Sequence, residues 1–522
     1  MFGPVPPLGE YVLMESLRDP LPNGRGSVEL AFYGPNRTPT VREGIRRQAE
    51  RVTNHAVKAL LAIFLTVLAL EGQTGFDQQF EWIKREATPA QLYAFLYAMP
   101  KGGDLHHHGT LAAFPEEWLS AATDPAVTQG NTFFTRLRFN ACPDSPEPFL
   151  HFQTIARYAY LKLSACVREE YLVLDRLSAE QRAGWLSAMR LDQPGEGRDE
   201  FFEQVVNRIL GLVRDPNVLS EVMARYIKRY GREGLRYLET QMGLSGGFDQ
   251  EGNPYPPERV AESMRKMLDR PDVRASGVTV RFLITVIRFR PDAEQRIEET
   301  YAFLHRNRDL FVGLSLAGRE DNDKGHALRF LDTFRKMRRR YSGIHLSIHA
   351  GEVDAPGTQV RDTLLLGAER IGHGLNLITD PETLVRMRDG RQLVEINLVS
   401  NRLLDYFPDL DRHPFPEYLR TGVPVCLNTD DAGVWDSNLT DEYFSAIRHF
   451  DLTWAEIRQM GRDSLKYSFA PEEVKRLMLA NFEMAMGDFE SRYAKNFAEG
   501  VAKVQPERSG YARRRLLAEG SY

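Results

Sequence analysis

Eight short runs of apolar and β-branched residues alternate with amphipathic helical stretches from residue 103 to residue 431. This alternation is typical of repeated βα units, whose parallel strands are buried between helices. Eight such units are the number that closes a TIM (β/α)8 barrel, so we expect an α/β fold of this architecture. The expected strands cover residues 103–108, 235–241, 278–287, 311–318, 345–352, 370–377, 393–401 and 423–431.

The chain is longer than one ordinary domain. Its 522 residues fit either two compact units or one large barrel with added segments. Most of the excess lies between the first two strands, where one helix would suffice, so we expect an insertion over about residues 115–198. We assign residues 71–522 to a barrel with this insertion and with an extra helical segment before the first strand.

The N-terminal region has a different character. Residues 1–55 are rich in Pro, Gly and Arg, and we expect them to be poorly ordered or to be an artefact of the gene model. Residues 56–70 follow a basic run and contain twelve uncharged apolar residues, too few to span a bilayer but suited to a signal peptide. This layout favours export to the periplasm or the exterior. The alternative is a helix packed on the barrel of a cytoplasmic protein.

Charge and cysteine content restrict the partners and the metal chemistry. The net charge of −5 arises from 67 basic and 72 acidic residues, so no global basic field attracts nucleic acid and a small-molecule partner is expected. We expect no stable membrane span, and a homodimer stays open. The three cysteines form no CxxC pair, so any metal must be held by histidine and carboxylate.

Polar residues interrupt the apolar runs at their C-terminal ends, which form the active-site face of such a barrel. The residues concerned are His106, His108, His349, His373 and the pair Asp430-Asp431. An HxH pair alone is more often a pair of solvated or core histidines than a metal site. Histidines and a carboxylate converging from several strands, however, indicate a site for zinc and, less selectively, for iron or manganese.

A metal at this position would lower the pKa of a bound water toward about 7, which favours hydrolysis. Glu352 is placed to donate a proton, or is simply a charge at a helix N-terminus. His373 either binds the metal or orients and deprotonates the water. If the last strand continues, Asp430 and Asp431 point in different directions, one to the metal and the other to the substrate or a second histidine.

Six motifs occur in order over this region, namely MPKGGDLHHH, LAGRE, SIHAGE, IGHG, SNRLL and NTDDAGVW. Together they resemble the adenosine deaminase family of metal-dependent amidohydrolases. The resemblance implies one Zn²⁺ per chain, held by His106, His108, His349 and Asp430. It implies that Glu352 donates a proton to the purine ring and that His373 assists the attacking water. It also implies substrate contacts by Gly318, Asp431 and His108, and a supporting SN pair at Ser400-Asn401.

Two positions depart from the family pattern. Family members usually carry an acidic ribose contact shortly after the HxH pair, whereas this chain has Gly109-Thr110. Ser315 stands where the family usually has aspartate, and we interpret it as scaffold.

The long segment after the first strand and the Phe201-Phe202 pair resemble the secreted, growth-factor-type branch of the family. That branch has a disulfide in its insertion, which implies a Cys142–Cys166 bond; the alternative is two unrelated buried thiols. Cys426 lies within the last expected strand and is interpreted as a core residue.

The leading hypothesis is therefore a zinc-dependent hydrolase that converts adenosine, and deoxyadenosine, to the inosine product and ammonia. One alternative is a deaminase of another purine, such as adenine, a modified adenosine or a nucleotide. Another is a non-catalytic extracellular signalling relative. A cytidine-type deaminase is excluded because the chain lacks its HxE and PCxxC pattern.

Overall fold

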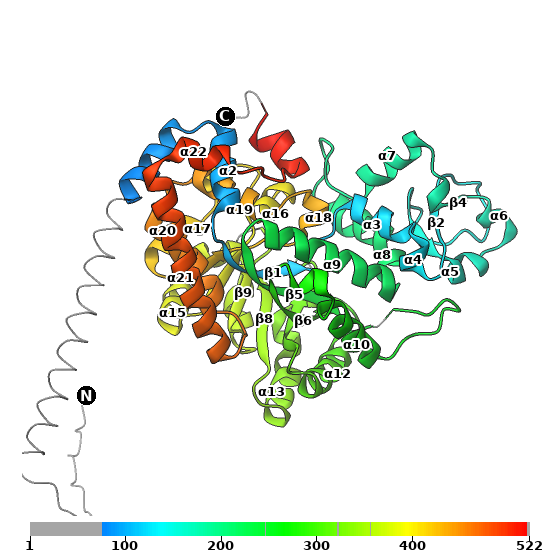
Figure 1. Cartoon of the computed structure of the whole chain (residues 1–522). Coiled ribbons are helices and arrows are strands. Elements are labelled where there is room, and N and C mark those ends of the chain that lie inside the picture. Colours follow the sequence, from blue (N-terminus) through cyan, green and yellow to red (C-terminus); the bar gives the residue numbers. More distant parts are fainter. Residues whose placement is uncertain (1–75, 246, 321–322, 355, 519–522) are drawn as a thin grey trace, which may run out of the picture. The chain divides into compact units, whose positions relative to one another are not determined.

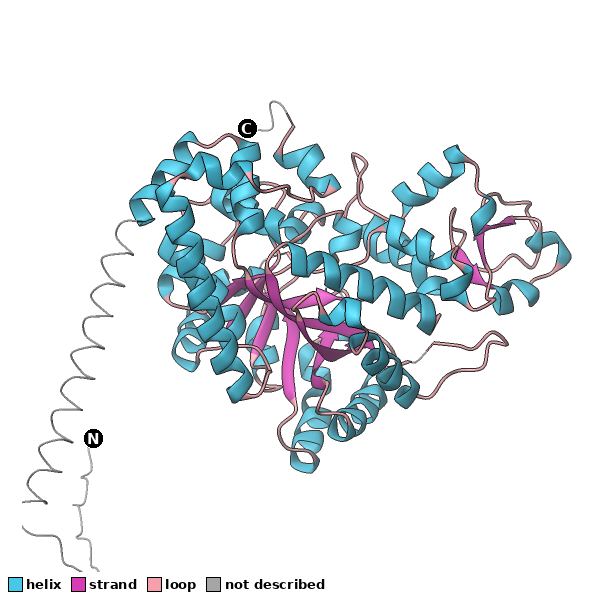
Figure 2. Cartoon of the chain, viewed as in Figure 1, coloured by secondary structure: helices cyan, strands magenta, loops and turns pink. Residues whose placement is uncertain are grey.

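A computed structural model describes residues 76–518 of the protein, except residues 246, 321–322 and 355. Its centre is an eight-stranded parallel sheet surrounded by helices (Figures 1 and 2). The last strand returns to the first, where His107 and Asp430 form a parallel β-bridge, so the predicted barrel is confirmed. In sheet order the strands are β1 (Gly102–His108), β5 (Leu235–Gly243), β6 (Thr279–Ile287), β7 (Phe311–Ala317), β8 (His345–Ala350), β9 (Arg370–His373), β10 (Leu393–Ile396) and β11 (Val425–Leu427).

Several strands end earlier than the apolar runs predicted. β10 stops at Ile396, and the rest of the expected strand forms helix α16 (Leu398–Leu403), so the prediction of a strand to residue 401 is wrong. β9 stops at His373, where His373 and Gly374 both have a φ of 62° and turn the chain out of the sheet. Short apolar runs suit a buried helix as well as a buried strand, which is why the pattern did not show where these strands end.

Amphipathic helices cover the outside of the barrel, as α9 illustrates. Asp215 caps its N-terminus by accepting hydrogen bonds from Asn217 and Val218, and Pro216 occupies the first turn. The helices of the barrel region are α9 (Pro216–Arg232), α10 (Pro257–Leu268), α11 (Pro271–Arg274), α12 (Ala293–Arg306), α13 (Leu331–Arg340), α14 (Gln359–Leu364), α15 (Pro381–Gly390), α16, α17 (Phe415–Thr421), α18 (Ala432–Trp435) and α19 (Leu439–His449).

Helices from both ends of the described chain pack together beside the barrel. Helical residues 76–86 and α2 (Pro89–Ala98) precede β1, which confirms the extra N-terminal helical segment. They meet the C-terminal helices through an aromatic cluster in which Phe80 and Phe95 lie 5.1 and 5.9 Å from Trp454 between ring centroids. The C-terminal helices are α20 (Trp454–Lys466), α21 (Glu472–Lys495) and α22 (Phe497–Ala502).

Between β1 and β5 the chain forms a small lobe to the right of the barrel in Figure 1. Its centre is an antiparallel sheet of three strands in the order β3-β2-β4, which lies within the expected insertion. The elements are α3 (Pro115–Ala122), α4 (Pro125–Thr128), β2 (Phe133–Arg136), β3 (Thr154–Ala156), α5 (Arg157–Leu161), α6 (Ala165–Arg168), β4 (Tyr171–Val173), α7 (Ala179–Ala188) and α8 (Val206–Val213).

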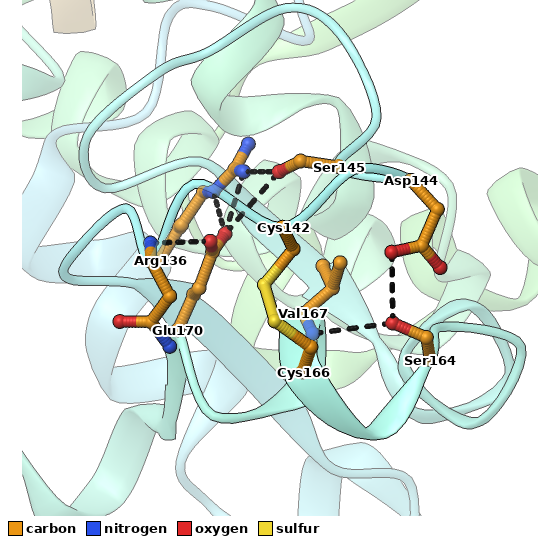
Figure 3. The surroundings of a disulfide bond; sticks show 9 residues. Arg136, Cys142, Asp144, Ser145, Ser164, Cys166, Val167 and Glu170 are labelled. Atoms are coloured by element: carbon orange, nitrogen blue, oxygen red, sulfur yellow. Dashed lines mark hydrogen bonds and ion pairs between the residues drawn. A yellow bond between two sulfur atoms is a disulfide. The ribbon is translucent and has the colours of Figure 1, made fainter.

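Cys142 and Cys166 form a disulfide in this lobe, with Cα atoms 6.0 Å apart and 24 positions of sequence between them (Figure 3). The implied bond is therefore confirmed. Beside it, Arg136 and Glu170 form a fully buried ion pair at 2.6 Å. Cys426 is a free, buried thiol in β11, as expected of a core residue.

The predictions for residues 1–55 and 56–70 concern a part of the chain outside the described residues. Among residues 76–518, leaving out residues 246, 321–322 and 355, no helix is long and apolar enough to cross a membrane.

Candidate active site

Four side chains meet where β1, β8 and β11 end. His108 Nε2 lies 3.1 Å from His349 Nε2 and 3.2 Å from Asp430 Oδ1. His106 Nε2 lies 3.5 Å from the same Asp430 oxygen. The barrel thus brings together all four residues that the sequence proposed as metal ligands.

The donor atoms of this cluster fit a bound cation. His106 Nε2 is buried and has no hydrogen-bond partner among the described residues. Two nitrogen ligands at about 2.0–2.1 Å from a tetrahedral zinc lie about 3.3 Å apart, close to the His108–His349 separation. Three imidazoles and one carboxylate, with no thiolate, are a donor set that suits zinc.

His373, on β9, also lies close enough to be a ligand, because its ring nitrogen is within 4.8 Å of donor atoms of His106, His349 and Asp430. A chain of hydrogen bonds decides its protonation. The Phe415 backbone N–H donates to His413 Nδ1 at 3.1 Å, so His413 carries its proton on Nε2, 3.1 Å from Asn401 Oδ1. Asn401 Nδ2 then donates to His373 Nδ1 at 3.1 Å.

Asn397 Nδ2 lies 3.2 Å from the same His373 Nδ1 and reinforces this direction. Neutral His373 therefore carries its proton on Nε2, and a protonated nitrogen donates hydrogen bonds but cannot ligate a cation. Burial lowers the pKa of His373 to about 3, so the ring stays neutral near pH 7. This arrangement favours His108 over His373 as the third histidine ligand.

The prediction that Asp430 and Asp431 point in different directions assumed that the last strand continues, but β11 ends at Leu427, so strand alternation does not apply to this pair. Asp430 has a φ of 55°, and donor atoms of both carboxylates and of His108 lie within 4.8 Å of one another. Asp431 Oδ1 is buried without a partner in the described part of the chain, so it is open to a hydrogen bond from a ligand.

Glu352 lies just beyond β8 and is nearly fully buried. Burial raises the pKa of its carboxyl group well above the ordinary value, and the nearby carboxylates of Asp430 and Glu320 add to the effect. This shift favours the protonated form of the carboxyl group, which is the form that can donate a proton. Its Oε2 lies 3.6 Å from His373 Nε2, which places both groups at one spot.

The residues that fix the backbone around Glu352 were not predicted from the sequence. Glu320 accepts hydrogen bonds from the backbone N–H groups of Gly351 at 3.0 Å and Glu352 at 3.2 Å. Arg288 pairs with Glu320 at 3.4 Å and also donates to the His349 carbonyl. The position of Glu320 inside the LAGRE motif was the one signal that could have indicated a role.

A second unpredicted group of side chains orients the ring of His106. Glu395 Oε2 lies 2.8 Å from His106 Nδ1, so it fixes the tautomer that leaves Nε2 free for a metal. Arg370 pairs with Glu395 at 2.7 Å and with Glu239 at 2.6 Å. All four side chains are almost completely buried.

The remaining predicted residues lie around this centre. Gly318 ends β7 with a φ of 100°, and a Cβ there would come within 2.9 Å of the Phe289 ring. A Cβ at Gly109 would lie 2.5 Å from Thr240 Oγ1, so packing leaves no room for a side chain at this departure from the family pattern. Ser400 and Ser315 are buried, and neither hydroxyl has a partner within the described ranges.

The sequence of the chain matches known proteins. The sequence model of the family described as adenosine deaminase matches residues 196–484. An adenosine deaminase of Shigella flexneri is 32% identical over 252 residues, which is 48% of this chain and 73% of that protein.

Two solved structures resemble the fold. The N6-methyl-AMP deaminase of Arabidopsis thaliana has a TM-score of 0.56 at 20% identity, covering 76% of this chain and 99% of that one. A Burkholderia ambifaria amidohydrolase with bound Zn has a TM-score of 0.56 at 18% identity, covering 80% and 96%.

Proposed function

Because the chain belongs to the adenosine deaminase family and is an enzyme of that purine-deaminating class, we propose that its reaction is the zinc-dependent hydrolysis of adenosine and deoxyadenosine. The products are inosine or deoxyinosine and ammonia. The observation that carries the proposal is the meeting of buried, unpartnered imidazole nitrogens with the buried carboxyl group of Glu352 at one barrel mouth. The presence of every metal and proton-donor residue argues against a non-catalytic signalling relative.

The metal would be held by His106, His108, His349 and Asp430, and when bound it would supply a water of lowered pKa. Glu352 donates its proton to a purine ring nitrogen, which makes the amino-bearing carbon more electrophilic. His373 Nε2–H donates a hydrogen bond to the oxygen that adds to this carbon. As the new C–O bond forms, one proton of the water restores Glu352 and the other passes to the amino group; the C–N bond then breaks and ammonia leaves.

Asp431 and Gly318 supply the substrate contacts in this proposal. Asp431 lies beside His108 and has one unpartnered oxygen, which is available to the imidazole side of the purine. The left-handed backbone of Gly318 turns its loop at the end of β7, where its peptide group is available to the six-membered ring.

The test is ammonia release from adenosine by the purified protein, with and without a zinc chelator. We expect chelation to abolish turnover and added zinc to restore it. His349→Ala should lose both metal and activity, whereas Glu352→Gln should keep the metal. Full zinc occupancy in His349→Ala, measured by elemental analysis, would refute the ligand assignment.

A second candidate is a purine other than adenosine, because the chain has Gly109-Thr110 where the family usually carries the acidic ribose contact. Adenosine, deoxyadenosine, adenine and AMP should therefore be compared side by side. Preference for adenine would favour this alternative.

We also propose that the mature protein begins near Leu70 and lies outside the cytoplasm. The Cys142–Cys166 disulfide supports this location, because such bonds persist in oxidising compartments. N-terminal sequencing of the native protein tests it, and an intact Met1 would refute it.

A further inference from the structure

The last part of the small lobe crosses the C-terminal face of the barrel. We call residues 190–203 the strap. Its first residues are fixed to the loop after β11, where the Leu191 N–H donates to the Val434 carbonyl at 3.0 Å and Arg190 pairs with Asp436 at 3.0 Å. Farther along, the Phe201 ring lies 4.9 Å from that of Trp435.

The middle of the strap is held by Arg198, which reaches two further catalytic loops. Its guanidinium donates to the two carboxylate oxygens of Asp354 at 3.1 and 3.2 Å, two residues beyond Glu352. It also donates to the Leu404 carbonyl at 3.3 Å and lies 4.0 Å above the Tyr406 ring.

The end of the strap meets Arg319, the residue between Gly318 and Glu320. Asp199 lies 2.9 Å from this guanidinium and Glu203 lies 3.6 Å from it. A π-helix over residues 200–205 shapes this segment, and such irregular turns are frequent at functional sites. The strap therefore contacts the loops after β7, β8, β10 and β11.

We propose that the strap is a specificity element that discriminates against phosphorylated substrates by neutralising the arginines at the mouth. The proposal rests on the proposed function and names the residues that select among its substrates. Asp199 and Glu203 neutralise Arg319, and Asp354 neutralises Arg198.

The direction in which a substrate must lie supports this role. The metal-ligand atoms are buried at the strand ends, whereas Asp354, Arg319 and the strap lie in segments beyond those ends. A purine nucleoside whose amino-bearing carbon reaches the ligands therefore directs its sugar outward, toward the strap. A 5′-phosphate would approach the same segment.

Charge at the strap then decides between nucleoside and nucleotide. An arginine without a carboxylate partner would bind a phosphate through two hydrogen bonds. Here the side chains of Asp199 and Glu203 are 85% and 68% exposed, so their charges lie in solvent beside Arg319. A phosphate dianion must either displace these two carboxylates from Arg319 or bind beside them against charge repulsion. An uncharged 5′-hydroxyl group requires neither the displacement nor the repulsion.

The test compares kcat/KM for adenosine and AMP in the full-length zinc enzyme and in the double variant Asp199→Asn/Glu203→Gln. We expect the AMP-to-adenosine ratio to rise about tenfold, the combined size of two exposed charge interactions. The gain should shrink as salt rises from about 0.1 M to 1 M, because screening shortens from about 10 to 3 Å. Glu180→Gln, an exposed charge removal on α7, is the matched control and should leave the ratio unchanged.

Binding of inosine and IMP, measured by calorimetry, gives the same comparison without turnover. An unchanged ratio in both assays, with normal adenosine turnover, would overturn the role of the strap alone. A wild-type protein that prefers AMP, or that binds neither product, would also overturn it. Absence of adenosine turnover in the wild type as well as in the variant, together with the expected shift in IMP binding, would instead refute the proposed function and leave the strap assignment standing.

Discussion

The substitution Glu395→Gln tests whether Glu395 orients His106 for metal binding or only stabilises the fold. The glutamate is fully buried and contacts His106 at 2.8 Å, Arg370 at 2.7 Å and the Ser347 hydroxyl at 2.8 Å. The substitution keeps the side-chain volume but removes the charge that balances Arg370. It leaves either an amide N–H facing the guanidinium or an unsupported imidazole.

Two magnitudes follow from this geometry. Breaking one partner of a buried ion pair costs about 3–5 kcal/mol of folding stability. Loss of a group that orients a metal ligand weakens metal binding about 10–100-fold, or about 1.4–2.7 kcal/mol. The variant should therefore lose both stability and zinc affinity.

Glu170→Gln is the matched control, because it breaks the equally buried Arg136–Glu170 pair in the small lobe. We expect it to lower the unfolding free energy by a similar amount without changing the zinc Kd. The assays are urea unfolding and competition with a fluorescent chelator. Equal zinc affinity in Glu395→Gln and Glu170→Gln would refute the argument that Glu395 orients the ligand.

Three further predictions concern catalysis, pH and the small lobe. Glu352→Gln should retain zinc but lose at least about a hundredfold in turnover, the scale of a lost general acid; near-normal kcat would place the proton donor elsewhere. Burial raises the pKa of Asp441 from 3.8 to about 7, so between these pH values the folded state holds a proton that the unfolded chain releases. The resulting contribution to the free energy of unfolding is complete below pH 4 and declines as the pH rises to 7. Asp441→Asn should flatten that decline in unfolding free energy measured from pH 4 to 8, and an identical slope would contradict it. Serine at both Cys142 and Cys166 opens a 24-residue loop worth about 3 kcal/mol, so limited proteolysis should cut the lobe before the barrel.

The sequence predicted the barrel and the main site residues because both depend on local patterns. Alternating apolar runs identify buried parallel strands, and polar residues at their ends identify the active-site face. The same logic placed His106, His349 and Asp430 together correctly.

What the sequence did not show depends on contacts between distant segments. Arg370 lies inside β9 and gave no sign that it joins Glu239 of β5 to Glu395 of β10. The choice between His108 and His373 as ligand likewise depends on the backbone N–H of Phe415. Its hydrogen bond sets the position of the proton on His373 through the side chains of His413 and Asn401. Neither relation has a spacing that a single sequence reveals.

The seam of the barrel has a consequence for biosynthesis. His106 and His108 come from the first strand and Asp430 follows the last, and in the same seam Asp104 binds Thr429 across 325 positions of sequence. A ribosome-bound chain therefore has no complete ligand set until nearly the whole barrel has been synthesised and closed. A complete metal site would therefore require the whole barrel, and a truncated product that ends before β11 would lack Asp430.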